Sequence, residues 1–170
     1  MYRQKRYKEC IKEVKSKLKR APNSLHLLNY HAMACSALKR DDEALLSYQK
    51  IRNIDPTLAG PYYNMGIILK RNGRVEEAIA SYKKAISLRS DYVQAYNNLG
   101  ILYKDQEKYD DAIASYKKAI SLRSDYVQAY NNLGILYKDQ EKYDDAIASY
   151  KKAISLRSDY VQAYNNLGIL

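Results

Sequence analysis

The chain has 170 residues, of which 46% are hydrophobic and 28% are charged, and its formal net charge is +10. A chain of this length can bury a core, but no apolar run approaches the roughly 20 residues that cross a bilayer, and the N-terminus lacks the apolar segment of a signal peptide. The two cysteines are too few for a disulfide framework. The composition therefore predicts a protein of the cytoplasm without a membrane partner.

The excess of positive charge lies in the first segment of the chain. Residues 1–24 hold nine Lys or Arg and two Glu, whereas residues 78–111 hold five basic and five acidic residues. Binding to nucleic acid requires net neutralisation of phosphates, which only the first segment can supply. Ile11, Val14 and Leu18 share one helical stripe there. We interpret this segment as the second helix of a partial repeat with a basic outer face, and we do not expect nucleic acid as a partner.

The chain repeats itself with a fixed period of 34. The repetition is perfect from Ala78 to Leu170, and the earlier chain keeps the same register more loosely. A fixed period of this length is typical of helical repeat proteins. Two series of small residues mark it: Ala32, Gly66, Gly100, Gly134 and Gly168, and Cys10, Ala44, Ala78, Ala112 and Ala146. The period divides the chain into a partial repeat at 1–24, full repeats at 25–58, 59–92, 93–126 and 127–160, and a partial repeat at 161–170.

Each repeat predicts two helices joined by a turn. In repeat 93–126, apolar residues recur at helical spacing in two stripes, one at Tyr96, Leu99 and Tyr103 and the other at Ala112, Ile113, Tyr116, Ala119 and Ile120. The polar segment KDQEK between the stripes is typical of a turn, and Asp125 with Gln128 is a candidate capping pair for the next helix. Small residues such as Gly100 let the two helices approach closely. Because one hairpin cannot bury both stripes, neighbouring hairpins must stack. This predicts an all-α fold, an α-solenoid of helix–turn–helix units.

The pattern resembles the tetratricopeptide repeat (TPR) family over essentially the whole chain. The resemblance rests on Tyr96, Leu99, Gly100, Tyr103, Ala112, Tyr116 and Ala119 and on their counterparts one period away. Tyr stands where the family often has Trp or Phe, and Ser124 stands where it usually has Pro. The resemblance implies a right-handed superhelix whose first helices line a concave groove. It also implies a protein-interaction scaffold that holds an extended peptide or a partner helix in that groove.

Amide side chains gather on the face that would line this groove. Gln94, Asn98 and Ile101 share one face of a helix and are flanked by Asn97 and Lys104. A primary amide pairs with both the C=O and the N–H of an extended backbone, and the row resembles the one that holds substrate peptide in the TPR superhelix of O-GlcNAc transferase. The candidate peptide-binding residues are Asn64, Gln94, Asn97, Asn98, Ile101, Lys104, Gln128, Asn131, Asn132, Ile135 and Lys138, with Asn98 and Asn132 at the centre. The same amides could instead solvate the face or bond to neighbouring helices.

No other chemistry stands out along the chain. The carboxylate clamp of some TPR proteins needs Lys or Arg at places that here hold Gln94, Asn98 and Ile101, so an acidic C-terminus is not expected as ligand. His26 and His31 show no accompanying Cys or carboxylate constellation, so we interpret them as packing or surface residues. The register predicts that Cys10 and Cys35 are buried core thiols. Without a nucleophile–base pair, phosphate loop or metal spacing, we expect neither an enzyme nor a cofactor.

Two further hypotheses stay open at this stage. The asparagine row and the end of the chain within a repeat are also consistent with the substrate-recruiting arm of a larger enzyme, such as a glycosyltransferase. Alternatively, the final half-repeat, with Tyr164, Leu167 and Leu170, could contact the first helix of another copy, which would give open-ended self-association.

Overall fold

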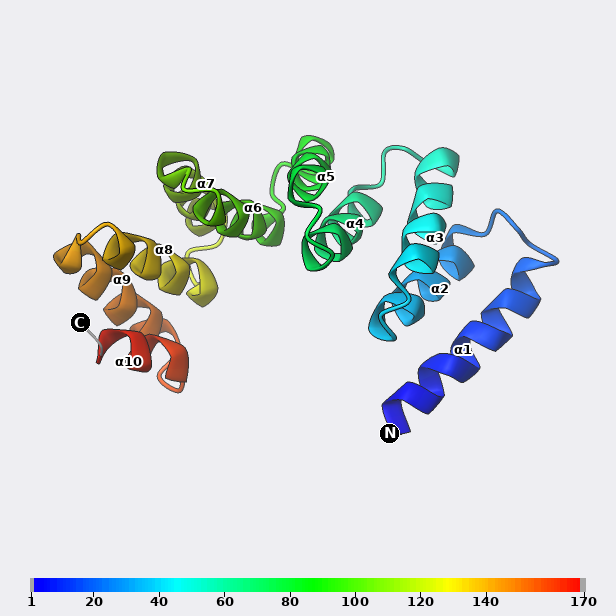
Figure 1. The fold of residues 1–170 in the computed structure, drawn as a ribbon, viewed down its shortest axis with the longest axis horizontal. Helices are drawn as coiled ribbons and strands as arrows, with labels where there is room; N and C mark the ends of the chain where they lie inside the picture. Colours follow the sequence, from blue (N-terminus) through cyan, green and yellow to red (C-terminus); the bar gives the residue numbers. More distant parts are fainter. Residues whose placement is uncertain (1, 169–170) are drawn as a thin grey trace. The chain divides into compact units, whose positions relative to one another are not determined.

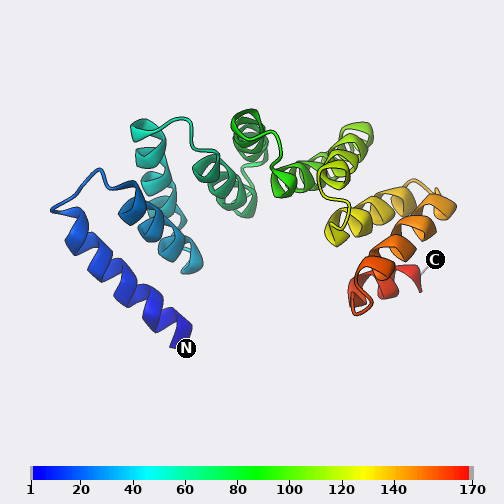
Figure 2. The same ribbon diagram turned by 180° about the vertical axis from the view of Figure 1, so that it is seen from behind.

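The computed structural model describes residues 2–168, with side chains from residue 6 onward, and over this span it is all-α (Figures 1 and 2). The helices are α1 (Tyr2–Leu18), α2 (Leu25–Ala37), α3 (Asp41–Ile54), α4 (Ala59–Arg71), α5 (Val75–Leu88), α6 (Val93–Asp105), α7 (Tyr109–Leu122), α8 (Val127–Asp139), α9 (Tyr143–Leu156) and α10 (Val161–Leu167). From α2 onward, the first helices of successive repeats begin exactly one period apart. Met1 and Leu170 lie outside the described residues.

The helices form two compact units, Met1–Arg89 with α1 to α5 and Ser90–Leu170 with α6 to α10. In the first unit, α2 packs with α3 and α4 with α5 as hairpins, α1 packs on α2, and α3 packs on α4. In the second unit, α6 packs with α7 and α8 with α9, α7 packs on α8, and the first helices α6, α8 and α10 also contact one another in turn. Each unit is therefore a stack of hairpins, and the expected α-solenoid is confirmed.

A glycine–tyrosine contact sets the distance between the two helices of a repeat. Tyr116 on α7 is fully buried, and a Cβ added at Gly100 on α6 would lie 2.5 Å from its Cε1 atom. The same contact recurs one repeat later between Gly134 and Tyr150. Since real Cβ atoms do not approach this closely, the missing side chain is what lets the ring fill the interface. The expectation that small residues allow close approach is confirmed.

The turn inside each repeat passes through one residue with a positive φ angle. These residues are spaced by one period: Lys39 (φ 57°), Gly73 (φ 73°), Glu107 (φ 59°) and Glu141 (φ 59°). The following N–H then reaches back into the first helix, as in the bond from Lys108 N to Tyr103 O at 2.9 Å. The turn expected in KDQEK is confirmed. The capping pair is not, because the N-cap of α8 is Tyr126 and no side chain caps that helix.

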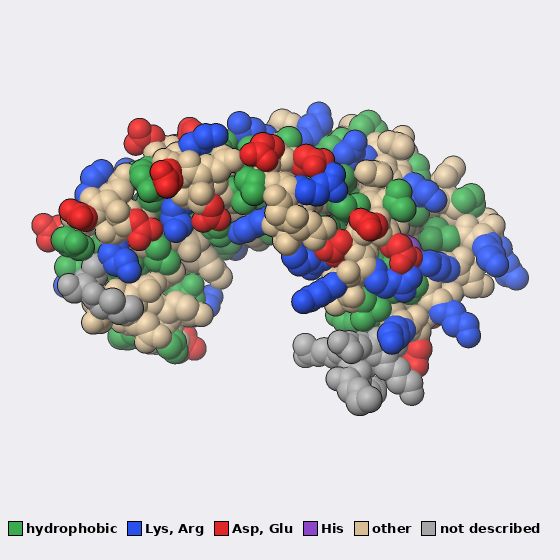
Figure 3. All heavy atoms as spheres, in the orientation of Figure 1, with side chains coloured by type: hydrophobic (Ala, Val, Ile, Leu, Met, Phe, Trp, Pro, Cys, Tyr) green, Lys and Arg blue, Asp and Glu red, His purple; other side chains and the backbone are tan. Residues whose placement is uncertain are grey.

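The first helix departs from the repeat register. The residue one period before Asp41, where α3 begins, is Tyr7, but α1 already begins at Tyr2. Ile11 and Val14 are buried on its inner side, as their spacing predicts. Figure 3 shows acidic and basic side chains interspersed on the face that it draws. Among the described residues, none of the helices is both long and apolar enough to span a bilayer.

Candidate functional site

The first helices of the second unit carry most of the residues expected to bind peptide. Those that lie partly exposed are Gln94, Asn98, Ile101 and Lys104 on α6 and Gln128, Asn132, Ile135 and Lys138 on α8. Two others differ, since Asn97 is 6% exposed and Asn131 is 5% exposed. The expected residues therefore share one helix face, but the asparagines differ in exposure. Asn98 and Asn132 are partly exposed, whereas Asn97 and Asn131 are buried.

The buried asparagines bond to the next repeat instead of facing solvent. Asn132 Nδ2 on α8 donates to Asn97 Oδ1 on α6 at 3.0 Å, and Asn166 Nδ2 on α10 donates to Asn131 Oδ1 on α8 at 3.0 Å. The expectation that Asn97 and Asn131 lie open on the groove face is wrong. The physical reason is that α6, α8 and α10 touch in turn, so a residue at this edge of one first helix meets the next first helix.

Lys104, Ile101 and Ile135 on the same helices also contact other side chains of this unit. Lys104 Nζ lies 3.4 Å from the Asp139 carboxylate of the next repeat. Ile101 and Ile135 pack against buried core side chains from their edges. Several polar side chains on the first helices of the second unit therefore bond to the adjacent repeat. The amides of Asn98 and Asn132 remain partly exposed to solvent.

The first unit has a hollow where the second has this bonded face. We call it the α2–α4 hollow; its volume is about 340 Å³, and it is lined by Tyr7, Met33, Ser36, Ala37, Tyr48, Asn64, Ile67 and Arg71. Met33 is 52% exposed and Ile67 is 37% exposed. Beside them, Asn64 is partly exposed and has no hydrogen-bond partner among the described residues. Of the expected site residues, only Asn64 falls in this hollow.

The repeat register identifies two further residues of the hollow, Met33 and Ile67. Met33 and Ile67 occupy the register of Ile101, which lies on the expected groove face, so counting back by one and by two periods would have identified them. Arg71 was not identifiable in this way. Its guanidinium pairs with Asp41 and donates to Ser36 Oγ at 3.3 Å, which fixes it as a wall of the hollow and neutralises its charge.

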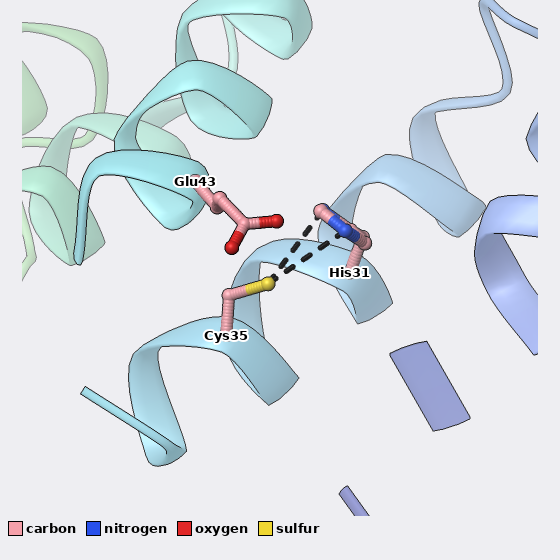
Figure 4. Close-up of side chains that lie close together, drawn as sticks. All are labelled: His31, Cys35 and Glu43. Carbon is pink, nitrogen blue, oxygen red and sulfur yellow. Dashed lines mark hydrogen bonds between the residues drawn. The ribbon is translucent and has the colours of Figure 1, made fainter. Parts of the chain in front are cut away.

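A second cluster lies in the core of the same unit (Figure 4). Ligand-type atoms of His31 and Cys35 on α2 and of Glu43 on α3 all lie within 4.8 Å of one another. The expectation that His31 has no Cys or carboxylate nearby is therefore wrong. Cys35 is buried as expected, but Cys10 is only half-buried. His26 is exposed and stacks edge-on against Tyr30, with ring centroids 4.6 Å apart.

Comparison with known proteins adds to this geometry. A family model described as tetratricopeptide repeat matches residues 57–125 and 93–159, which together make up more than half of the chain. Comparison with the curated proteins finds no significant match.

Solved structures of similar fold cover almost all of the chain. The crystal structure of MamA is similar at 28% identity and a TM-score of 0.81, with 89% of each chain covered. TTC0263, a thermophilic TPR protein from Thermus thermophilus, is 23% identical with a TM-score of 0.74, and the match covers 99% of this chain and 92% of that one. YrrB, described as a TPR protein with an unusual peptide-binding site, is 16% identical with a TM-score of 0.78, and the match covers 95% of this chain and 83% of that one. The last two likenesses show the fold alone.

Proposed function

Because the chain belongs to the tetratricopeptide repeat family, a family of protein-interaction scaffolds, we propose that its first-helix faces bind an extended peptide and that the α2–α4 hollow takes an apolar side chain of that peptide. The observation that carries this proposal is the hollow itself. It combines exposed apolar side chains, Met33 and Ile67, with the amide of Asn64.

The chemistry of the hollow suits one kind of ligand. Covering the side chains of Met33 and Ile67 removes apolar surface from water, at roughly 25 cal/mol per Å². The Asn64 amide has two donor hydrogens and an acceptor oxygen, which match the C=O and N–H of one peptide unit. The Arg71 charge is neutralised by Asp41, so an acidic side chain has no special advantage there. These features favour a peptide with an aliphatic or aromatic residue at this point.

The second unit offers weaker support for the same mode of binding. Gln94, Gln128 and Asn98 keep partial contact with solvent on their first helices. The bond from Asn132 uses one of its two Nδ2 hydrogens, so its second hydrogen and its oxygen remain chemically able to pair with a peptide. We propose these amides as secondary contacts with the peptide. Asn97 and Asn131 are buried and accept hydrogen bonds from Asn132 and Asn166.

The test compares the hollow with a matched apolar site elsewhere. A peptide library is passed over the wild-type protein, over Met33→Ala/Ile67→Ala, and over the control Leu46→Ala. Leu46 is 57% exposed on the second helix α3, and its register holds Ala in the later repeats. We expect the double variant to bind the selected peptides at least about tenfold more weakly, since that corresponds to about 1.4 kcal/mol of lost burial. Equal affinity of all three proteins would reject the hollow.

The alternative of a substrate-recruiting arm of a larger enzyme would use the same groove. It stays a prediction, and the sequence of the gene beyond residue 170 discriminates it: an encoded catalytic domain would support it, and further repeats alone would remove it. Self-association also stays a prediction. Tyr164 on α10 is exposed, and a molecular mass that does not change with concentration would reject it.

A further inference from the structure

The core of the first full repeat, residues 25–58, contains a histidine and a cysteine at places where the following repeats have neither. His31 and Cys35 are four residues apart on α2, so their side chains lie on one face of the helix. Cys35 Sγ is 3.7 Å from His31 Nε2. The carboxylate of Glu43, from the first turn of α3, completes the group, whose ligand atoms all lie within 4.8 Å of one another (Figure 4).

Ser47 holds one nitrogen of the imidazole ring, Nδ1, and leaves Nε2 for another partner. The Ser47 hydroxyl donates its single proton to the carbonyl oxygen of Glu43, at 3.1 Å. It can then only accept at its second contact, the 2.8 Å approach of His31 Nδ1. With a cation on Nε2, this arrangement lets Nδ1 keep the ring proton and donate it to Ser47 Oγ. Metal-binding histidines are typically fixed in this way by a hydrogen bond from the other ring nitrogen.

The repeat register shows which of these residues are unusual. A serine recurs at the place of Ser47 and an acidic residue at the place of Glu43 in each of the following three repeats. The place of His31 holds Met65, Leu99 and Leu133 instead, and the place of Cys35 holds Leu69, Tyr103 and Tyr137. Only this repeat places a nitrogen and a sulfur ligand beside the recurring carboxylate. Both are deeply buried, with His31 7% exposed and Cys35 0% exposed.

We propose that His31 Nε2, Cys35 Sγ and Glu43 form a binding site for a borderline-soft divalent cation of the Zn²⁺ class, with the fourth position open. Two ligands of one tetrahedral zinc, at Zn–N and Zn–S distances of about 2.0 and 2.3 Å, are about 3.5 Å apart, and Cys35 Sγ is 3.7 Å from Nε2. Because Sγ is also 3.9 Å from Nδ1, it lies beside the ring, and the Cys35 side chain must turn toward Nε2 when the cation binds. A thiolate with an imidazole selects Zn²⁺ over Mg²⁺ or Ca²⁺, which prefer oxygen. On coordination, the cation replaces the thiol proton of Cys35, which passes to solvent.

Two features oppose the cation and set its affinity. The Glu43 carboxylate is paired with Lys15 Nζ at 2.9 Å and with Arg40 Nε at 2.6 Å, so coordination must displace at least one of these cations. All three side chains are about a third exposed or more, so Lys15 and Arg40 can turn into solvent while Glu43 rotates inward. Burial also raises the pKa of the Cys35 thiol and lowers the pKa of His31. The imidazole is thus already neutral, and the thiol must give up its proton.

The test uses Co²⁺ as a spectroscopic probe of the 170-residue chain and Zn²⁺ as its competitor. For the wild-type protein we expect one bound Co²⁺, with the visible absorption of a tetrahedral site and a thiolate charge-transfer band, both abolished by Zn²⁺. The matched control is His31→Met/Cys35→Leu, which installs the residues of the next repeat at these two places and should keep the fold. We expect it to lose both bands, and we expect Zn²⁺ to raise the melting temperature of the wild-type protein but not of this variant.

Two further variants make each part of the proposal testable. Cys10→Ala, which matches the register residue Ala44, should keep the thiolate band, since Cys10 is not a ligand. Ser47→Ala leaves all three ligands but frees the imidazole, and it should weaken Zn²⁺ binding about 10- to 100-fold. The proposal is overturned if the wild-type protein shows no thiolate band, if Cys10→Ala removes it, or if His31→Met/Cys35→Leu, confirmed as helical by circular dichroism, retains it.

Discussion

The two units of the molecule use the same helical register in opposite ways. In the second unit, where the repeats are identical, side chains on the first helices bond to different side chains of the adjacent repeat, as Asn132 does with Asn97 and Lys104 with Asp139. In the first unit, where each repeat differs, the same register holds Met33, Asn64 and Ile67, which line a hollow. Because Asn64 and Ile67 match Asn132 and Ile135 in register, the residue types at these places do not by themselves decide between bonding to the adjacent repeat and exposure to a ligand.

The largest expected effect concerns the glycine–tyrosine contact. A methyl group in Gly134→Ala would meet the buried ring of Tyr150 at 2.6 Å, so we expect a net loss of about 1–2 kcal/mol after the gain in helix propensity. The first unit already holds Ala32 in this register, and Ala32→Gly should cost about 1–2 kcal/mol, from the helix propensity of glycine and from the loss of a buried methyl group. Urea unfolding of both variants measures the difference. An unchanged midpoint for Gly134→Ala would show that the helix spacing adapts freely.

Substitution of Asn132 and of Asn64 should have different effects on the free energy of unfolding and on peptide affinity. Asn132→Ala removes the donor to Asn97 Oδ1, and because Asn97 keeps 6% exposure, leaving that acceptor unsatisfied should cost about 1 kcal/mol, the lower end of the usual range. Asn64→Ala removes an amide without a hydrogen-bond partner among the described residues, so it should change stability by less than about 0.5 kcal/mol while weakening peptide binding. Thermal melts and binding titrations of the two variants side by side check this. The contrast between the units is wrong if both variants lose the same stability.

The smallest effect is expected at the turns. Gly73 holds the left-handed position in the first unit, and Glu141 holds the equivalent position in the second with φ 59°. Because this conformation costs a residue with a side chain about 1 kcal/mol, Glu141→Gly should be stabilising by up to about that amount and Gly73→Ala destabilising by a similar amount. Denaturation midpoints of the two variants should shift in opposite directions. A shift of both in the same direction would contradict the assignment of strain to this backbone position.

Repetition made the fold and part of the site predictable. The period of 34 and the apolar stripes depend on residues close in sequence, so they indicate helices, turns and the close approach at Gly100 without a structure. The position of Asn97 was not predictable in this way. A helical wheel separates Asn97 from Asn98 by about 100°, but it does not say which edge the next first helix covers.

The group formed by His31, Cys35 and Glu43 was predictable from the sequence only in part. The spacing of four between His31 and Cys35 is visible in the sequence and places both side chains on one face of a helix. Glu43 lies on the other helix of the hairpin, so its approach depends on how α2 and α3 pack. Pairs within one helix can be found from spacing, whereas groups that span two helices need the packing.

Backbone amide chemical shifts can map where a bound peptide contacts the protein. Isotope-labelled protein is titrated with a peptide selected from the library, and the shifts of all assigned amides are followed. If the α2–α4 hollow binds the peptide, we expect the largest changes at Met33, Asn64 and Ile67, on the first helices that line it. Changes concentrated instead on the outer residues of the second helices, such as Leu46 and Lys50, would contradict this expectation.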